Sequence, residues 1–202
     1  MKETDPFAAA DFRKCVDFHG HICPGLVMGY RAAKAGLQWL RENRAEDEEV
    51  VAVVETDSCG ADAVQVLTGC TFGKGNFLFR DYGKMAFTFL SRASGQGVRV
   101  ARKAAATPPD DRHGELVQKM RNGTASEEEK REFRALHLSR ARLLLEMPLE
   151  ELFALKPAAL TLPEKARIEP TRICDGCGEP VMASRLAEQQ GRRLCRACAL
   201  PP

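Results

Sequence analysis

EEVVAVVETDSCGADAVQVLTGC, at residues 48–70, is the stretch that decides the fold. Residues 50–54 are apolar on both faces and rich in β-branched side chains, which predicts a central strand. The Asp-Ser pair at 57–58 is expected to cap a short helix over 61–68, and Gly69 to end it. The stretch therefore predicts a buried strand followed directly by a short helix.

Further elements on both sides of this stretch predict a mixed fold. FLF at 77–79 is expected to form a strand, and the segments 85–91 and 98–102 a β-hairpin around SGQG. Before the stretch, amphipathic patterns predict helices over 7–18 and from residue 26 to about 43. The fold class that follows is α+β, with a core domain of mixed helices and a β-sheet.

A charged helical segment follows these strands. TPPDD at 107–111 is expected to form a turn that caps one helix, and SEEE at 126–129 matches a capping box that opens a second helix. We treat both helices as a helical insert at 107–147. His113 and His137 lie on them, and we interpret both as surface or packing residues.

Composition divides the chain into three parts. Residues 1–155 are expected to form the core domain, and residues 172–202 a separate small module. Residues 156–171 are interpreted as the linker between them. The irregular stretch that contains this linker is punctuated by four prolines: Pro148, Pro157, Pro163 and Pro170.

The charge balance argues against several classes of partner. The chain has 202 residues with 30 basic and 28 acidic side chains, and its net charge of +2 gives no strong case for binding nucleic acid or an anionic membrane. No apolar segment near the start predicts a signal peptide, and the run at 50–55 is too short to span a bilayer. We therefore expect a cytoplasmic protein whose eight cysteines stay reduced.

The C-terminal module contains a four-cysteine pattern. Cys174 and Cys177 are two residues apart, seventeen residues follow, and Cys195 and Cys198 repeat the two-residue gap. This spacing is typical of a zinc site, and four thiolates leave no open position, so we expect a structural zinc that supplies the module's folding energy. The alternative is two redox-active pairs, which lack the surrounding βαβ pattern. The module has no aromatic residue for base stacking, so protein contact or bracing is favoured over nucleic-acid binding.

A second group of metal-type side chains lies in the core domain. HGHICPG holds His19, His21 and Cys23, while Cys59 follows the central strand and Cys70 follows the short helix. If folding packs the turn against the strand end, these five side chains gather in a cleft that suits a transition metal. The helix N-terminus is expected to lower the pKa of the Cys23 thiol. Cys23 and Cys59 are the candidate catalytic residues.

Simpler interpretations of these residues stay open. Free cysteines often act as small buried hydrophobes, and we expect this of Cys15 above all. His19 and His21 alternate, so in an extended turn they point apart and one of them faces the site. Asp62 is a candidate polar partner, although a solvated helix cap explains it equally well.

Several stretches resemble the FmdE family, which takes its name from formylmethanofuran dehydrogenase. FHGHICPGLVMGYRAA, DSCGADAVQVLTGCTFGKGN and DYGKMAF, followed by LPEKARI and CDGCGEPV, occur in order over roughly residues 12–102 and 160–198. The resemblance implies an α+β core domain, often dimeric, with a C-terminal treble-clef zinc finger in some members. It suggests a metal or thiol-lined cleft in the core, which falls on His19, His21, Cys23, Cys59 and Cys70. It also implies a link, by name, to the molybdenum or tungsten enzyme that reduces carbon dioxide onto methanofuran in methanogenesis.

Three functions are compatible with these patterns. The leading one is a metal-binding protein with an open Cys/His site in the core, where an ion such as zinc activates water or holds a substrate, and a structural zinc in the tail. It would be an accessory subunit or an enzyme of formylmethanofuran dehydrogenase-type one-carbon metabolism, and the residues leave open which. The alternatives are an interaction protein whose zinc finger docks a partner, and a thiol redox sensor that uses Cys23 with Cys59 or Cys70.

Overall fold

The computed structural model describes residues 5–104, 111–158 and 161–200, and it divides into two compact units, Met1–Lys165 and Ala166–Pro202. The first unit contains a five-stranded mixed sheet with helices, and the second contains two small hairpins and four cysteines. The predicted α+β class is therefore confirmed. Within the described ranges, every helix is too short or too polar to cross a membrane.

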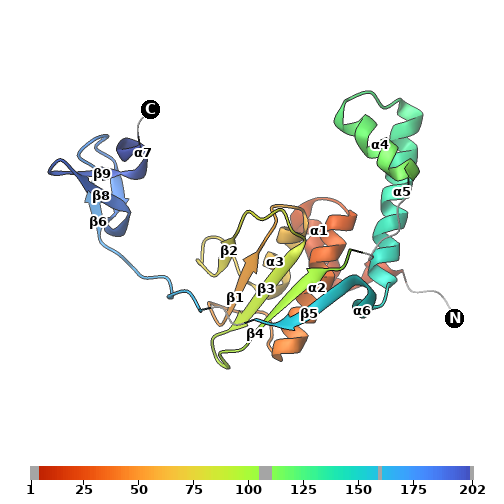
Figure 1. Ribbon diagram of the computed structural model, residues 1–202, viewed down its shortest axis with the longest axis horizontal. Helices are drawn as coiled ribbons and strands as arrows, with labels where there is room; N and C mark the ends of the chain where they lie inside the picture. Colours follow the sequence, from red (N-terminus) through yellow and green to blue (C-terminus); the bar gives the residue numbers. More distant parts are fainter. Residues whose placement is uncertain (1–4, 105–110, 159–160, 201–202) are drawn as a thin grey trace. The chain divides into compact units, whose positions relative to one another are not determined.

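The sheet is built around the apolar strand that the sequence predicts. Its order is β2-β1-β3-β4-β5, with β1 parallel to β2 and the other neighbours antiparallel (Figure 1). Every residue of β1 and β3 is buried, as expected for strands with a neighbour on each side. The strands are β1 (Val50–Val54), β2 (Phe77–Phe79), β3 (Ala86–Ser91), β4 (Gly97–Arg102) and β5 (Phe153–Pro157).

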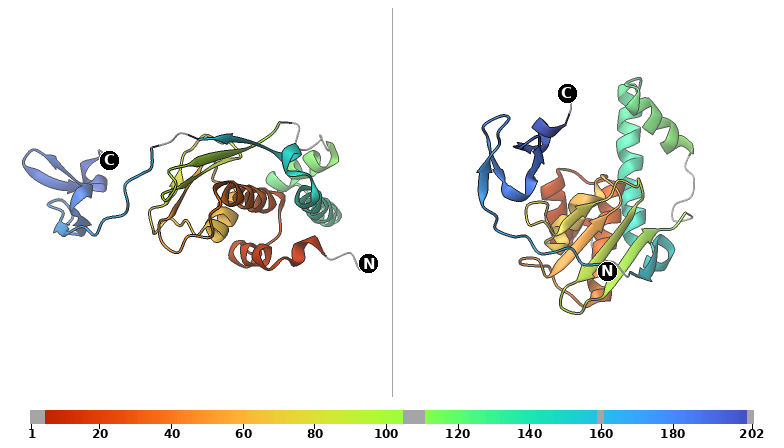
Figure 2. Two further views of the ribbon diagram at one scale, coloured as in Figure 1. Left: turned by 90° about the horizontal axis from the view of Figure 1, so that it is seen from below. Right: turned by 60° about the vertical axis from the view of Figure 1, so that its left-hand side comes forward.

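Three helices form the layers on one side of the sheet. Helices α2 (Pro24–Leu40) and α3 (Gly60–Thr68) pack against the strands, and α1 (Ala10–His19) packs against α2 and α3 (Figure 2). Fully buried phenylalanines, among them Phe12 and Phe87, fill the space between these layers. The N-termini of α2 and α3 lie at the end of the core domain where the predicted His/Cys turn is found.

Several helix ends differ from the sequence prediction. The helix expected over 7–18 is split into a short 3-10 turn, η1 (Pro6–Ala8), and α1, because Ala9 has an extended backbone. Helix α2 ends at Leu40 rather than near residue 43, because Arg41 adopts a left-handed conformation with φ 57°. Gly69 ends α3 in a left-handed conformation, as predicted.

The start of α3 also differs from the prediction. Its N-cap residue is Cys59 and not the pair at 57–58. The backbone N–H of Ser58 instead donates to the Thr56 hydroxyl oxygen at 3.2 Å. The consequence is that a thiol, and not a carboxylate or hydroxyl, occupies the residue directly before this helix.

The helical insert contains α4 (Asp111–Arg121) and α5 (Glu127–Glu146). The predicted capping box is confirmed, because Ser126 and Glu129 exchange hydrogen bonds at the start of α5. The turn expected at 107–110 lies outside the described residues. Arg31 of α2 donates to three carbonyl oxygens at the other end of α5, at 2.6 to 2.9 Å, and so fixes α5 to the core.

The stretch after Pro148 is more regular than the sequence indicates. A single turn, α6 (Leu149–Leu152), leads into β5, which pairs with β4 in the register Val100↔Leu155. Residues 153–157 therefore complete the core sheet. Their short run of mixed apolar and polar residues gives little local signal, and pairing with β4 determines the strand.

The second unit is built from hairpins and one short helix. Of its described residues, Cys174 and Leu194 are the two that are buried. Such a small core does not balance the chain entropy lost on folding. The elements are β6 (Thr171–Ile173), β7 (Pro180–Met182), η2 (Ala183–Arg185), β8 (Leu186–Gln189), β9 (Arg192–Cys195) and α7 (Arg196–Ala199).

Candidate metal centres

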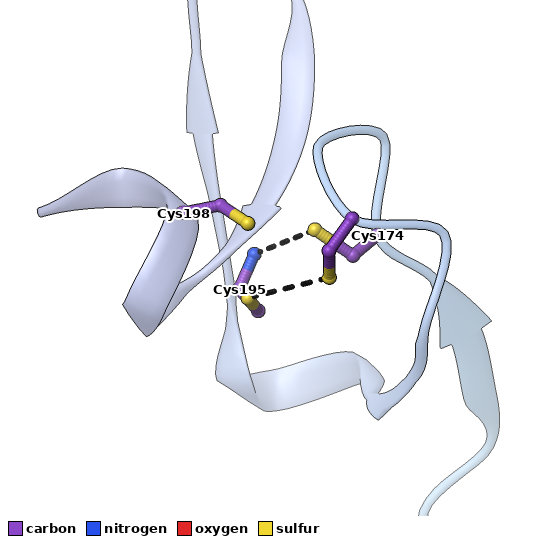
Figure 3. A group of neighbouring side chains, drawn as sticks. Cys174, Cys195 and Cys198 are labelled. Carbon is purple, nitrogen blue, oxygen red and sulfur yellow. Dashed lines mark hydrogen bonds between the residues drawn. The ribbon is translucent and has the colours of Figure 1, made fainter.

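The four tail cysteines lie around one centre. Their sulfur atoms are all within 4.8 Å of one another, and those of Cys177 and Cys195 are 4.0 Å apart. Figure 3 shows Cys174, Cys195 and Cys198 converging, with Cys198 on α7. Four thiolates on a tetrahedral zinc have sulfur atoms about 3.8 Å apart. The donor set and its geometry therefore fit a closed zinc site.

Backbone N–H groups prepare the Cys174 sulfur for a metal. The N–H groups of Cys195 and Gly176 donate to it at 3.2 and 3.3 Å. These bonds, that of Cys195 first, lower the pKa of Cys174 to about 6. Because a zinc ligand must be a thiolate, this donor is largely ionised at neutral pH before any ion arrives.

Three glycines bring the N-termini of α2 and α3 together in the core domain. A Cβ atom on Gly29 would lie 2.1 Å from the carbonyl oxygen of Gly60, and one on Gly60 would lie 3.1 Å from that of Gly25. A larger residue at Gly29 would force the two helices apart. Cys23 and Cys59, the N-cap residues of α2 and α3, consequently flank Gly25 from either side. A Cβ on Gly25 would be 3.9 Å from the sulfur of Cys23 and 3.8 Å from that of Cys59.

His19 is held between a carboxylate and a thiol. It ends α1, where Gly20 turns the chain in a left-handed conformation with φ 94°. Its Nδ1 lies 2.7 Å from an oxygen of Asp62, in the first turn of α3, and its Nε2 lies 3.8 Å from the sulfur of Cys23. A metal-ligating histidine usually donates its second nitrogen to a carboxylate in this way. Asp62 therefore orients His19, and Nε2 is the free donor.

The two histidines of the turn lie on the same side, contrary to the prediction. The ligand atoms of His19, His21 and Cys23 are all within 4.8 Å of one another, and the two rings are 4.5 Å apart. The expected alternation fails because α1 continues to His19 and the chain then reverses at Gly20, so the segment is not extended. His21 is exposed, whereas the side chain of His19 is 11% exposed.

The Cys23 thiol has a higher pKa than predicted. The N–H of Leu26 donates to its sulfur at 3.3 Å and favours the thiolate, but burial outweighs this effect and the neighbouring Cys59 adds to it. The pKa of Cys23 is raised to about 11. Without a metal this thiol is protonated and is a weak nucleophile, and binding an ion would displace the proton.

Cys70 does not join this group. Its thiol donates to the carbonyl of Val50 at 3.2 Å, at the start of β1, whereas Cys59 follows the end of that strand. Helix α3 spans nine residues, or about 13 Å, and carries the chain back along the strand. Cys15 is fully buried, as expected, and burial raises its pKa to about 12. Both residues are core cysteines.

A hollow of about 970 Å³ lies elsewhere on the core domain. It is lined by the C-terminal parts of α2 and α3 and by aromatic residues that include Phe18 and Phe72. Among the described residues that line it, the His/Cys group is not represented. The expected cleft over that group is therefore not this hollow.

The glycine contacts are the feature that sequence reasoning missed. Gly25 and Gly29 are four residues apart, on one face of a helix, and Gly60 directly follows Cys59. Small residues with this spacing permit close approach of two helix backbones. That pattern was available as a signal that the two cysteines meet.

Comparison with known proteins identifies both units. Residues 18–154 match the family described as FmdE, Molybdenum formylmethanofuran dehydrogenase operon. Residues 169–201 match the prokaryotic dksA/traR C4-type zinc finger. The first match includes the whole His/Cys group of the core, and the second includes all four tail cysteines.

Two individual proteins are similar over most of the chain. A probable S-adenosyl-L-methionine-binding protein of Archaeoglobus fulgidus is 32% identical over 193 residues, which cover 91% of this chain. The matched part is 50% of that relative, so the chain spans about half its length. The crystal structure of an FmdE-like protein of tungsten formylmethanofuran dehydrogenase, from Syntrophus aciditrophicus, has a TM-score of 0.61 at 24% identity, covering 98% of this chain and 97% of that one.

The family model covers well over half of the chain, and its match coincides with the domain that holds the His/Cys group. The solved structure has the same fold over nearly the full length of both chains. The protein therefore belongs to the FmdE family and carries a C4-type zinc finger after its core domain.

Proposed function

We propose that the core domain binds a transition metal, best matched by zinc, through His19, Cys23 and Cys59. The observation that carries the proposal is the hydrogen-bonded series from Asp62 to His19 to Cys23, in which the carboxylate leaves Nε2 of His19 directed at the thiol. Imidazole with two thiolates is a donor set that suits zinc and other borderline metals.

The proposed centre has an open position. Three protein ligands leave one corner of a tetrahedral ion for water, a substrate or His21, which lies within reach and is exposed. A zinc with an open position supplies Lewis-acid chemistry or an activated water. In this chain His19 would be oriented by Asp62, and Cys23 would give up its proton as the ion binds.

Family membership supports the next step of the proposal. The family description and the name of the Syntrophus structure connect such proteins with formylmethanofuran dehydrogenase. We extend this link to the chain as a metal-carrying accessory protein or enzyme of one-carbon metabolism, acting in the cytoplasm as a homodimer. Light scattering on the purified protein gives the oligomeric state directly, and a monomer at micromolar concentration would contradict the dimer.

A second function, protein interaction through the tail, is favoured by its surface. Four large apolar side chains of the tail unit are exposed: Ile168, Ile173, Met182 and Leu200. A structural zinc would fix the hairpins that carry three of them, and exposed apolar residues in so small a module suit contact with another protein. Capture of a partner by the full chain, lost when Met182 and Ile173 become Ser, would support this function.

Metal content of purified variants tests the leading proposal. After dialysis against metal-free buffer, the wild type should retain two ions per chain, and Cys59→Ser and Cys174→Ser should each retain one fewer. Cys15→Ser is the matched control, because it removes a buried thiol outside both centres. A single ion that disappears with Cys174→Ser would refute the core centre and leave the interaction function. Reversible loss of two free thiols on mild oxidation would instead support the redox sensor.

A further inference from the structure

The four histidines of the chain form two neighbouring pairs. His19 and His21 belong to the core group, and His113 of α4 faces His137 of α5. The Nε2 of His113 lies 3.1 Å from the Nδ1 of His137, with the rings stacked 5.4 Å apart. His21 is among the groups, after burial and His113, that lower the pKa of His137. The two pairs are thus close enough to interact electrostatically.

The surroundings hold the second pair in place. The ring of Phe133 packs against both imidazoles, with centroid distances of 5.7 Å to His113 and 4.8 Å to His137. Helix α5 is itself fixed to α2 by the three hydrogen bonds of Arg31. Both nitrogen atoms therefore have defined positions before any ligand binds.

We propose that His113 and His137 together bind a divalent transition metal and pass it by way of His21 to the core centre. Two imidazole nitrogens that share one zinc are about 3.3 Å apart, close to the observed 3.1 Å. The binding of the ion stands on this geometry alone, whereas the transfer rests on the proposed function of the core.

The second pair has the properties of an exchange site. Within the described ranges, no third His, Cys, Asp or Glu joins the two histidines as a compact ligand group. Two protein ligands leave the remaining positions to water, so the ion is held weakly and leaves readily. The core centre, in contrast, contains the buried Cys23 and the mostly buried His19. An exposed intermediate ligand such as His21 can join the two sites.

His137→Phe separates ligation from packing. Phenylalanine preserves the stack with Phe133 and His113 and removes the ligand nitrogen, so the melting temperature should be unchanged. The probe is zinc, titrated by calorimetry into the full chain with its tail and core centres filled. The wild type should bind one further, weaker zinc, and the variant should bind it at least about tenfold more weakly, the smallest loss expected even for an outer-shell change. Phe133→Leu, which keeps both histidines, should retain this binding.

The rate of core loading tests the transfer. Chain depleted of core zinc is mixed with zinc, and loss of the Cys23 proton is followed by thiolate-to-metal absorption. His137→Phe should slow loading and leave final occupancy unchanged.

Each outcome of these experiments is decisive. Equal weak binding by wild type and His137→Phe would show that the pair is only packing and overturn the proposal. Lost weak binding with an unchanged loading rate would overturn the transfer. If Cys23→Ser leaves the tightly bound metal unchanged while the weak zinc still depends on His137, the proposed core function has failed and the second pair has not.

Discussion

The two candidate centres are built in opposite ways. In the tail, two pairs of cysteines two residues apart are brought together by short hairpins. In the core, His19, Cys23 and Cys59 come from the ends of three different helices. The tail centre depends on local spacing and the core centre on tertiary packing. A closed structural site can thus be read from sequence, whereas an open site depends on the fold that carries it.

The ligands of the two centres also differ in protonation. Backbone N–H groups lower the pKa of Cys174 to about 6. Burial raises the pKa of Cys23 to about 11 despite a similar N–H contact. A metal that enters the core must therefore displace a proton that Cys174 in the tail has already lost at neutral pH. This difference favours retention in the tail and controlled loading in the core.

The largest effect is expected from breaking the tail centre. Cys174→Ser should unfold the tail unit, because a structural zinc supplies on the order of 10 kcal/mol and this unit buries two of its described residues. Amide hydrogen exchange should become fast across 166–200 and stay slow in β1 and β3. Persistent protection in the tail of the metal-depleted variant would contradict a metal-dependent fold.

Separating the two core helices should have the next largest effect. Gly29→Val would place side-chain atoms against the Gly60 carbonyl, so the core domain should lose at least about 2 kcal/mol of stability and its metal. Denaturant unfolding and metal analysis measure both. Gly114→Ala is the matched control, because its Cβ meets open space on α4, and it should add about 0.5 kcal/mol. Retention of the core metal by Gly29→Val would show that the glycine contacts do not set the site.

Removing the partner of His19 should weaken the core centre without unfolding it. Asp62→Ala frees the imidazole, so core zinc affinity should fall by roughly 10- to 100-fold. Competition with a chelator measures this, and the tail affinity should not change. The exposed Asp57 of the same loop offers a control, as Asp57→Ala should leave both affinities unaltered. Equal affinities in wild type and Asp62→Ala would mean that the carboxylate is only a salt-bridge partner.

The smallest effect is expected at Cys70. Its thiol bonds to Val50 and lies away from the centre, so Cys70→Ala should cost about 1 kcal/mol of stability and leave both metals bound. Thermal unfolding with metal analysis tests both statements. Loss of one metal in this variant would restore Cys70 to the ligand set.

Local chemistry explains which features the sequence predicts. The β-branched run of β1, the glycine that ends α3, the Ser126 capping box and the tail cysteine spacing are all decided by neighbouring residues, and all are found. Strand β5 is formed by pairing with β4, and no periodicity announces it. Tertiary contacts decide such elements.

The same distinction applies within the core centre. Residue types in HGHICPG indicate metal chemistry, but the orientation of His21 depends on where α1 ends. The position of Cys70 depends on the direction in which α3 returns along β1. Neither quantity is encoded in a short window of sequence. The pKa of Cys23 likewise follows from burial, which opposes the local helix-end effect.

Anomalous diffraction at the zinc edge, from crystals of the zinc-loaded full chain, tests the central claim most directly. The account predicts a peak among the four tail cysteines and a second peak about 2.0 to 2.3 Å from Nε2 of His19 and from the sulfurs of Cys23 and Cys59. A tail peak with no density between the N-termini of α2 and α3, and with the His19 ring bonded only to Asp62, would contradict it.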